Sequence, residues 1–144
     1  MTHQAVGTDI VAVPRIETLI RDRGSAFLNR WFTAHEIDYC SAKAVPSRHF
    51  AARFAAKEAV LKALPVEWDG PLPWRSIEII SQPGGAPSVR LHGALLAAAS
   101  RAGTSEISVS LSHCDEYATA TALVTATSAG DPGHQSSPGA EDAG

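Results

Sequence analysis

Apolar and polar positions alternate along several short stretches of the chain. At 107–111, Ile107, Val109 and Leu111 alternate with serines, the period of a strand with one buried face. Residues 4–13 form an apolar, strand-like run that is interrupted by Gly7 and Asp9. Two further short runs, 77–82 and 88–91, flank a Pro-Gly-Gly-Ala-Pro turn, and a last run covers 117–125 after a turn at 114–116. The pattern predicts one N-terminal strand and two hairpins.

Helical signals occupy much of the remaining chain. Pro14 fits the first turn of a helix and Gly24 its end, while Thr33 and Glu36 have the spacing of a capping box. The longest helical segment is rich in alanine and stops before Pro65. Helices are therefore predicted at 14–23, from Thr33, at 48–64 and at 94–102, with a further turn of helix at 25–32.

This order of elements favours an α+β fold. Two adjacent hairpins build an antiparallel sheet more readily than a parallel one, and the helices pack against it. We expect one domain over residues 1–126. Residues 127–144 are Ser, Gly, Ala, Pro and acidic residues, and we expect a disordered tail there.

Composition limits the classes of function. The 144 residues are 44% hydrophobic and 19% charged, with a net charge of −3. Basic residues exceed acidic ones up to residue 62 and the reverse holds afterwards, which argues against nucleic acid and indicates one face that meets phosphates or an acidic protein. Cys40 and Cys114 have no metal-ligand spacing. With no signal peptide or apolar span visible, we expect a soluble, cytoplasmic protein with no membrane partner.

Glu58 is out of place on the longest helix. At about 100° per residue it lies on the same side as Phe50, Phe54 and Leu61. A carboxylate on a packed face needs a cation or hydrogen bonds. Two interpretations stay open: an i, i+4 salt bridge with Lys62, or a metal or substrate role.

Asp9 is a second misplaced carboxylate, inside an apolar strand where aspartate is a poor strand former. It is either a turn or bulge residue, or, with Glu58, an oxygen ligand of a hard cation such as Mg²⁺.

Several cations and one histidine are ambiguous in the same way. Arg53, Lys57 and Lys62 form either a solvated helix face or a set of anion ligands. His113, at a strand end, is either a structural hydrogen-bonding residue or a catalyst. The chain has neither a P-loop nor a Rossmann glycine motif.

Three stretches of the chain resemble the holo-acyl-carrier-protein synthase family of phosphopantetheinyl transferases. The first is Val6-Gly-Thr-Asp-Ile-Val-Ala-Val-Pro-Arg15, with Asp9 after the glycine. The second is Arg53-Phe-Ala-Ala-Lys57-Glu58-Ala-Val-Leu-Lys62, which is highly specific. The third is Ile107-Ser-Val-Ser-Leu-Ser-His113. The resemblance covers roughly residues 5–125.

This resemblance implies a role for each matching residue. It implies metal ligands at Asp9 and Glu58, and an acid close to the site at Glu36. The residues that it places at coenzyme A are Arg53, Lys57, Lys62, Gly85, Pro87 and His113. Of these and the ligands, Glu58, Lys62 and His113 are implied to be catalytic. Arg15 and Arg21 match the basic surface on which the carrier protein docks, and the family is usually a homotrimer with sites between protomers.

The implied reaction is Mg²⁺-dependent transfer of phosphopantetheine from coenzyme A to a serine of apo-acyl-carrier protein. A base must accept the serine proton, and Glu58, a metal-bound water, Glu36 and His113 all qualify. Ala86 stands where the family has a basic residue, and Ala5 and Thr8 also depart from its pattern. Two rival functions are a carrier-docking module without catalysis and a metal-dependent pyrophosphate hydrolase. A third possibility keeps the transfer reaction but modifies a carrier domain of a polyketide or peptide synthetase.

Overall fold

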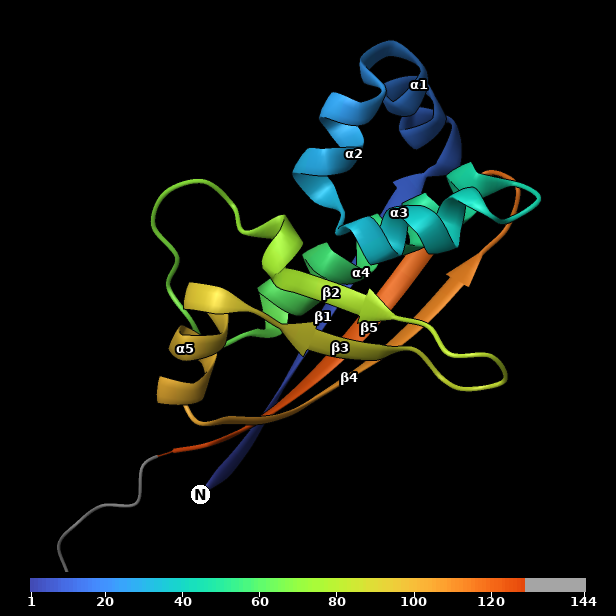
Figure 1. Ribbon diagram of the computed structural model, residues 1–144. Helices are drawn as coiled ribbons and strands as arrows, with labels where there is room; N and C mark the ends of the chain where they lie inside the picture. Colours follow the sequence, from blue (N-terminus) through green and yellow to red (C-terminus); the bar gives the residue numbers. More distant parts are fainter. Residues whose placement is uncertain (129–144) are drawn as a thin grey trace, which may run out of the picture.

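The computed structural model describes residues 1–128, which form a five-stranded antiparallel sheet with helices against it (Figure 1). The strand order is β1-β5-β4-β3-β2, so the N-terminal strand pairs with the last one. The strands are β1 (Thr2–Ala12), β2 (Ile77–Ile80), β3 (Ser88–Leu91), β4 (Thr104–His113) and β5 (Tyr117–Thr127). The helices are α1 (Val13–Arg23), α2 (Ser25–Trp31), α3 (Ala34–Ser41), α4 (Pro46–Ala63) and α5 (Gly93–Arg101), with a 3₁₀ turn η1 at Trp74–Ser76.

Helix α4 is the centre of the core. Eleven of its residues are buried, among them Phe50 and Phe54 and most of its alanines. It lies across strands β1, β5 and β4. In β5 the residues that face α4 are small, and Ala118, Ala120 and Ala122 are all buried while the residues between them are exposed. Small side chains on both surfaces let the helix approach the sheet closely.

Gly7 marks the closest approach of β1 to α4. A Cβ atom at this position would lie 1.9 Å from the carbonyl oxygen of Ala59 and 3.2 Å from the backbone nitrogen of Ala63. Because both atoms belong to the helix backbone, no side-chain rotation relieves the clash.

Gly7→Ala is therefore expected to lower the free energy of unfolding by about 3 kcal/mol or more, since overpacking here must displace a helix. Chemical denaturation measures this change. Gly85→Ala is the control, because its new methyl group would meet its nearest neighbour, the Gln82 Cβ, at 3.6 Å. Equal stability of the two variants would contradict the close approach.

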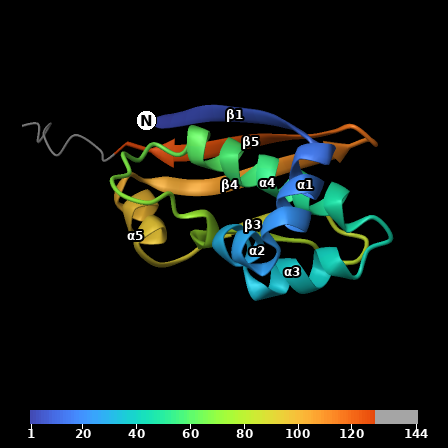
Figure 2. The same cartoon turned by 90° about the horizontal axis from the view of Figure 1, so that it is seen from above.

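The opposite face of the sheet carries no helix in the part of the chain that the structure describes (Figure 2). Val6 and Ile10 on β1 are 67% and 66% exposed on this face, and Tyr117 and Leu123 on β5 are also exposed. Val6 pairs with Leu123 across the two strands and Ile10 lies on the same face beyond the Thr8–Thr121 pair, so this exposed strip is largely apolar with threonines within it.

The predicted α+β class and most of the predicted elements are confirmed. The helix ends at Gly24 as expected, and the Thr33–Glu36 capping box is present with both hydrogen bonds. The turn of helix at 25–32 is a separate helix, α2. Strand β5 extends to Thr127, and the rest of the predicted tail, residues 129–144, lies outside the described residues.

No helix within residues 1–128 is both long enough and apolar enough to span a membrane.

Candidate functional site

Asp9 and Glu58 come together because β1 runs directly against α4. Asp9 lies two residues after Gly7, with its side chain 16% exposed. The ammonium of Lys62 lies 3.2 Å from Asp9 Oδ1 and donates to the carbonyl of Thr8 at 3.1 Å. Within residues 1–128, Glu58 and Lys62 form no ion pair, so the i, i+4 salt bridge is the wrong alternative. Lys62 instead joins the helix to the strand.

The electrostatics of Glu58 reflect this pairing of carboxylates. Burial raises the pKa of Glu58 and the charge of Asp9 raises it further, while Lys62 and Arg15 act in the opposite direction. A carboxylate whose pKa is raised by a neighbouring carboxylate is an arrangement that a bound cation relieves.

The donor set fits a magnesium ion. Mg²⁺ binds oxygen ligands and commonly takes one or two carboxylates together with substrate phosphates. The described residues contain no group of three or more His, Cys, Asp and Glu side chains suited to a metal. Asp9 and Glu58 would supply two oxygen ligands to such an ion, with phosphate oxygens and water as the others.

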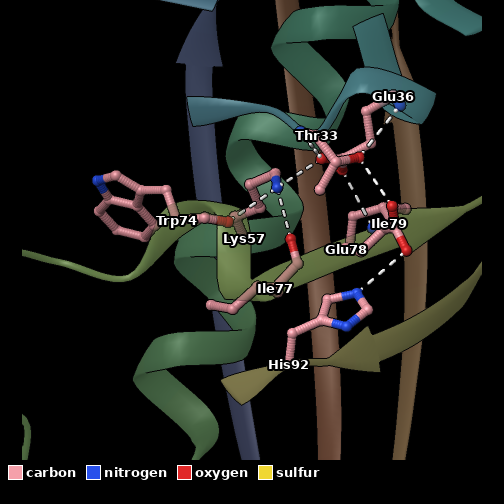
Figure 3. Close-up of polar contacts among 8 residues, drawn as sticks. All are labelled: Thr33, Glu36, Lys57, Trp74, Ile77, Glu78, Ile79 and His92. Atoms are coloured by element: carbon pink, nitrogen blue, oxygen red, sulfur yellow. Dashed lines mark hydrogen bonds and ion pairs between the residues drawn. The ribbon is translucent and has the colours of Figure 1, made fainter. Parts of the chain in front are cut away.

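Lys57 points into the protein, toward Glu36 and the backbone of Trp74 and Ile77 (Figure 3). Its side chain is 0% exposed, and its ammonium donates to Glu36 Oε1 at 2.8 Å, to the carbonyl of Trp74 at 2.9 Å and to the carbonyl of Ile77. These three acceptors use all three of its protons. Burial lowers the pKa of Lys57, and Glu36 opposes that shift. The predicted contact of Lys57 with coenzyme A phosphates is therefore wrong for this structure.

Glu36 is equally enclosed. Its carboxylate accepts from the ammonium of Lys57 and from the backbone nitrogens of Thr33, at 2.9 Å, and Ile79, at 3.1 Å. A carboxylate with these partners and 1% exposure cannot reach a substrate proton. Glu36 is thus removed from the candidate bases. The ion pair of Glu36 and Lys57 joins α3 and α4 to the start of β2.

The network continues to the surface of the molecule. The hydroxyl of Thr33 donates to Glu78 Oε2 at 2.8 Å, and the ring of His92 lies 3.2 Å from Glu78 Oε1 (Figure 3). Hydrogen bonds from Thr33 and His92 lower the pKa of Glu78 against the effect of its burial.

Arg53 is buried but retains a free donor. Its guanidinium lies 4.5 Å from the ring of Tyr39 and donates to the hydroxyl of Ser81 and to the carbonyl of His49. Its Nε atom is buried and has no hydrogen-bond partner among residues 1–128. A buried, unpaired guanidinium donor is costly unless an acceptor reaches it, which fits an anion ligand.

The other predicted coenzyme A residues lie at the surface. His113 is the exposed last residue of β4. Gly85 and Pro87 lie in the turn between β2 and β3, where the backbone N–H of Gly85 donates to the carbonyl of Gln82 at 3.1 Å.

A groove between α1 and α2 shows residues that sequence analysis missed. Its cavity volume is about 270 Å³, and its floor is aromatic. The guanidinium of Arg15 lies 5.8 Å from the ring of Phe54, and Trp31 stacks on the same ring at 3.9 Å. The groove is lined by Arg15, Leu19, Arg23, Ala26, Phe27, Arg30, Trp31 and Phe54.

Arg15, Leu19 and Arg23 are spaced by four residues, and this spacing could have predicted that they share one face of α1. Arg21 does not line this groove. It lies 3.5 Å from Asp22 and borders a different hollow with Ile20 and Leu28.

The family of the chain follows from its sequence. Residues 5–122 match the family model described as the 4′-phosphopantetheinyl transferase superfamily, so this chain belongs to that superfamily.

Its relatives narrow the class further. The chain is 48% identical over 118 residues to the holo-[acyl-carrier-protein] synthase of Moorella thermoacetica, covering 82% of this chain and 91% of the relative. The enzyme of the same name from Koribacter versatilis is 42% identical, with 82% and 94% covered.

Solved structures give the same result. The holo-[acyl-carrier-protein] synthase of Neisseria meningitidis matches with a TM-score of 0.75 at 32% identity, covering 83% of this chain and 96% of that one. The Helicobacter pylori enzyme in complex with coenzyme A matches with a TM-score of 0.71 at 33% identity, with 83% and 98% covered.

Proposed function

We propose that this chain is a holo-[acyl-carrier-protein] synthase. It transfers 4′-phosphopantetheine from coenzyme A to a serine of apo-acyl-carrier protein and releases 3′,5′-ADP. The observation that carries this proposal is the pairing of Asp9 and Glu58 beside Lys62, in a chain whose relatives bear this name. The similar Helicobacter pylori enzyme is known in complex with coenzyme A.

Asp9 and Glu58 would hold a Mg²⁺ ion. When bound, this ion neutralises charge on the pyrophosphate of coenzyme A. Lys62, 54% exposed and adjacent to Asp9, would bind a phosphate oxygen. Arg53 would donate to another anion from its Nε atom, which has no partner among residues 1–128. Of the protein groups first considered as base for the serine proton, Glu58 and His113 remain, because Glu36 is enclosed.

The groove under Arg15 is the proposed docking surface for the carrier protein. Three arginines surround an aromatic floor, which suits an acidic partner that also presents an apolar side chain. The charge of Arg15 also lowers the pKa of Glu58, so the groove borders the proposed metal ligands. A serine delivered by a protein in this groove would arrive near the paired carboxylates.

Arg15→Glu is expected to raise the KM for the carrier protein about tenfold, equivalent to roughly 1.4 kcal/mol, because it places a negative charge opposite an acidic partner. The KM for coenzyme A should change much less. Steady-state kinetics with each substrate varied in turn measure both values. Arg101→Glu, at the exposed end of α5, is the control. Equal effects of Arg15→Glu on both substrates would remove the groove from docking.

A homotrimer would complete the site. On α4, Arg53 and Glu58 are five residues apart and so point about 140° apart around the helix, which leaves the two halves of a substrate site on different sides. Neighbouring copies would pack through the exposed strip of Val6, Ile10 and Leu123. Each substrate site would then combine the Arg53 side of one copy with the Glu58 side of the next. Sedimentation of the purified protein with the mass of three chains would support this assembly.

The carrier protein of fatty acid biosynthesis is the proposed client, and the reaction is placed in the cytoplasm. A polyketide carrier domain is the alternative client, and competition between the two carriers in one reaction would decide between them.

Mass spectrometry of apo-acyl-carrier protein, incubated with this protein, coenzyme A and Mg²⁺, tests the proposal, with EDTA as a control. A gain of the phosphopantetheine mass that disappears with EDTA is the expected result. Coenzyme A consumed without a mass gain would indicate a hydrolase, and no change in either substrate would overturn the proposed function.

A further inference from the structure

His49 on α4 contacts both Arg53 and His113. The sequence predicts that these two residues contact coenzyme A. The His49 ring lies 5.1 Å from the His113 ring with an angle of 65° between their planes, an edge-to-face arrangement that aromatic rings favour. On its other side, the carbonyl of His49 accepts a hydrogen bond of 3.2 Å from Arg53 Nη1. His113 is exposed at the end of β4. The ring of His49, on α4, is the aromatic group that contacts it.

A second contact holds the same end of the β4–β5 hairpin. Arg48 Nη2 lies 2.5 Å from Asp115 Oδ1, which pairs the residue before His49 with the second residue after His113. The first turns of α4 therefore contact the hairpin end at two points, one aromatic and one ionic.

The charges around His49 are consistent with this packing. Burial lowers the pKa of His49, and the nearby charges of His113, Arg53, Lys43 and Arg48 lower it further. The lowered pKa favours the neutral form of the ring, which packs against His113 with less repulsion than a charged ring would meet. Asp115, the acidic group facing this turn of the helix, is occupied by Arg48.

We propose that His49 and Arg48 are positioning residues that hold His113 in place for coenzyme A. An exposed imidazole that is free to rotate loses conformational entropy when it binds a ligand, whereas one already held by neighbours loses less. This inference rests on the proposed function, since it concerns the affinity of that site for its substrate.

The aromatic contact is tested by His49→Ala and His49→Phe. The alanine variant should raise the Kd of coenzyme A, measured by calorimetry, about tenfold, and its KM by a similar factor, a loss of binding that a merely structural role of His49 would not produce. The phenylalanine variant keeps a ring against His113 and should restore most of the affinity. The midpoint of thermal unfolding confirms that each variant is folded.

The ionic contact is tested by exchanging charges. Arg48→Asp places two carboxylates side by side and should raise the KM for coenzyme A about two- to fivefold, the range of an exposed ion pair. An acidic residue in the first turn of a helix is favourable, so this variant should fold. Arg48→Asp with Asp115→Arg should recover the affinity of the unchanged protein, and Arg101→Asp serves as a surface control.

The outcomes separate this inference from the proposed function. If the unchanged protein binds coenzyme A and transfers phosphopantetheine, but His49→Ala binds coenzyme A equally well, the positioning role is overturned. A double exchange that is no better than Arg48→Asp alone removes Arg48 from it. Failure of the unchanged protein to bind coenzyme A would overturn the proposed function and this inference with it.

Discussion

Replacing Lys57 with methionine is expected to lower the free energy of unfolding by about 3–5 kcal/mol, one of the two largest effects in this protein. The substitution leaves the carboxylate of Glu36 buried without its cation, at 1% exposure. It also removes the donor that the carbonyls of Trp74 and Ile77 share. Guanidinium denaturation followed by tryptophan fluorescence measures the loss, since Trp74 lies within the network.

Two further variants show whether the pair acts as a unit. Lys62→Met, on the same helix, should cost less than about 1 kcal/mol, because Lys62 is 54% exposed and its ion pair with Asp9 is open to solvent. Glu36→Leu with Lys57→Met removes both charges and should cost less than the two single changes added together, with a coupling of about 1–3 kcal/mol.

Recovery in the double variant should be incomplete. The backbone groups of Thr33, Ile79, Trp74 and Ile77 lose their side-chain partners in it. Strictly additive costs would show that Glu36 and Lys57 are independent, contrary to the 2.8 Å contact.

Replacing Glu58 with glutamine is expected to reduce Mg²⁺-supported transfer about 100-fold or more, while the protein stays folded. The amide keeps the size of the side chain but removes the negative charge that a hard cation requires. Removing the charge of Glu58, whose pKa is raised by burial and by the charge of Asp9, relieves repulsion, so stability should not fall. Mass spectrometry of the carrier protein over a Mg²⁺ titration measures the change.

Asp9→Asn is expected to have a similar effect, because it removes the other ligand. Glu67→Gln, in an exposed loop, is the matched control and should keep full activity. Transfer near the level of the unchanged protein in either Glu58→Gln or Asp9→Asn would contradict the assignment of the metal ligands.

The fold was largely predictable because its signals are local. The capping box at Thr33, the glycine after α1 and the alternation in β4 depend on neighbours within a few residues. The separation of α2 from its neighbours was less clear, since seven residues contain only two turns of periodicity.

The candidate site was predictable only in part. Asp9 and Glu58 were conspicuous as carboxylates in apolar surroundings, and in the structure the charge of Asp9 raises the pKa of Glu58. The groove arginines Arg23 and Arg30 were missed because exposed cations on a helix are common. Their significance depends on the aromatic floor of the groove, to which α4 adds Phe54 from a distant part of the chain.

The sequence by itself determined the class of fold, the family and the two misplaced carboxylates. The tertiary structure alone decided the partners: Lys62 pairs with Asp9 instead of Glu58, and the adjacent cation Lys57 is buried against Glu36. The physical reason is that periodicity fixes the direction in which a helical side chain points. The residue that it meets there depends on the segments that pack against that side. Here these are β1, drawn close by Gly7, and α3 with the start of β2, which approach neighbouring residues of α4 from different directions.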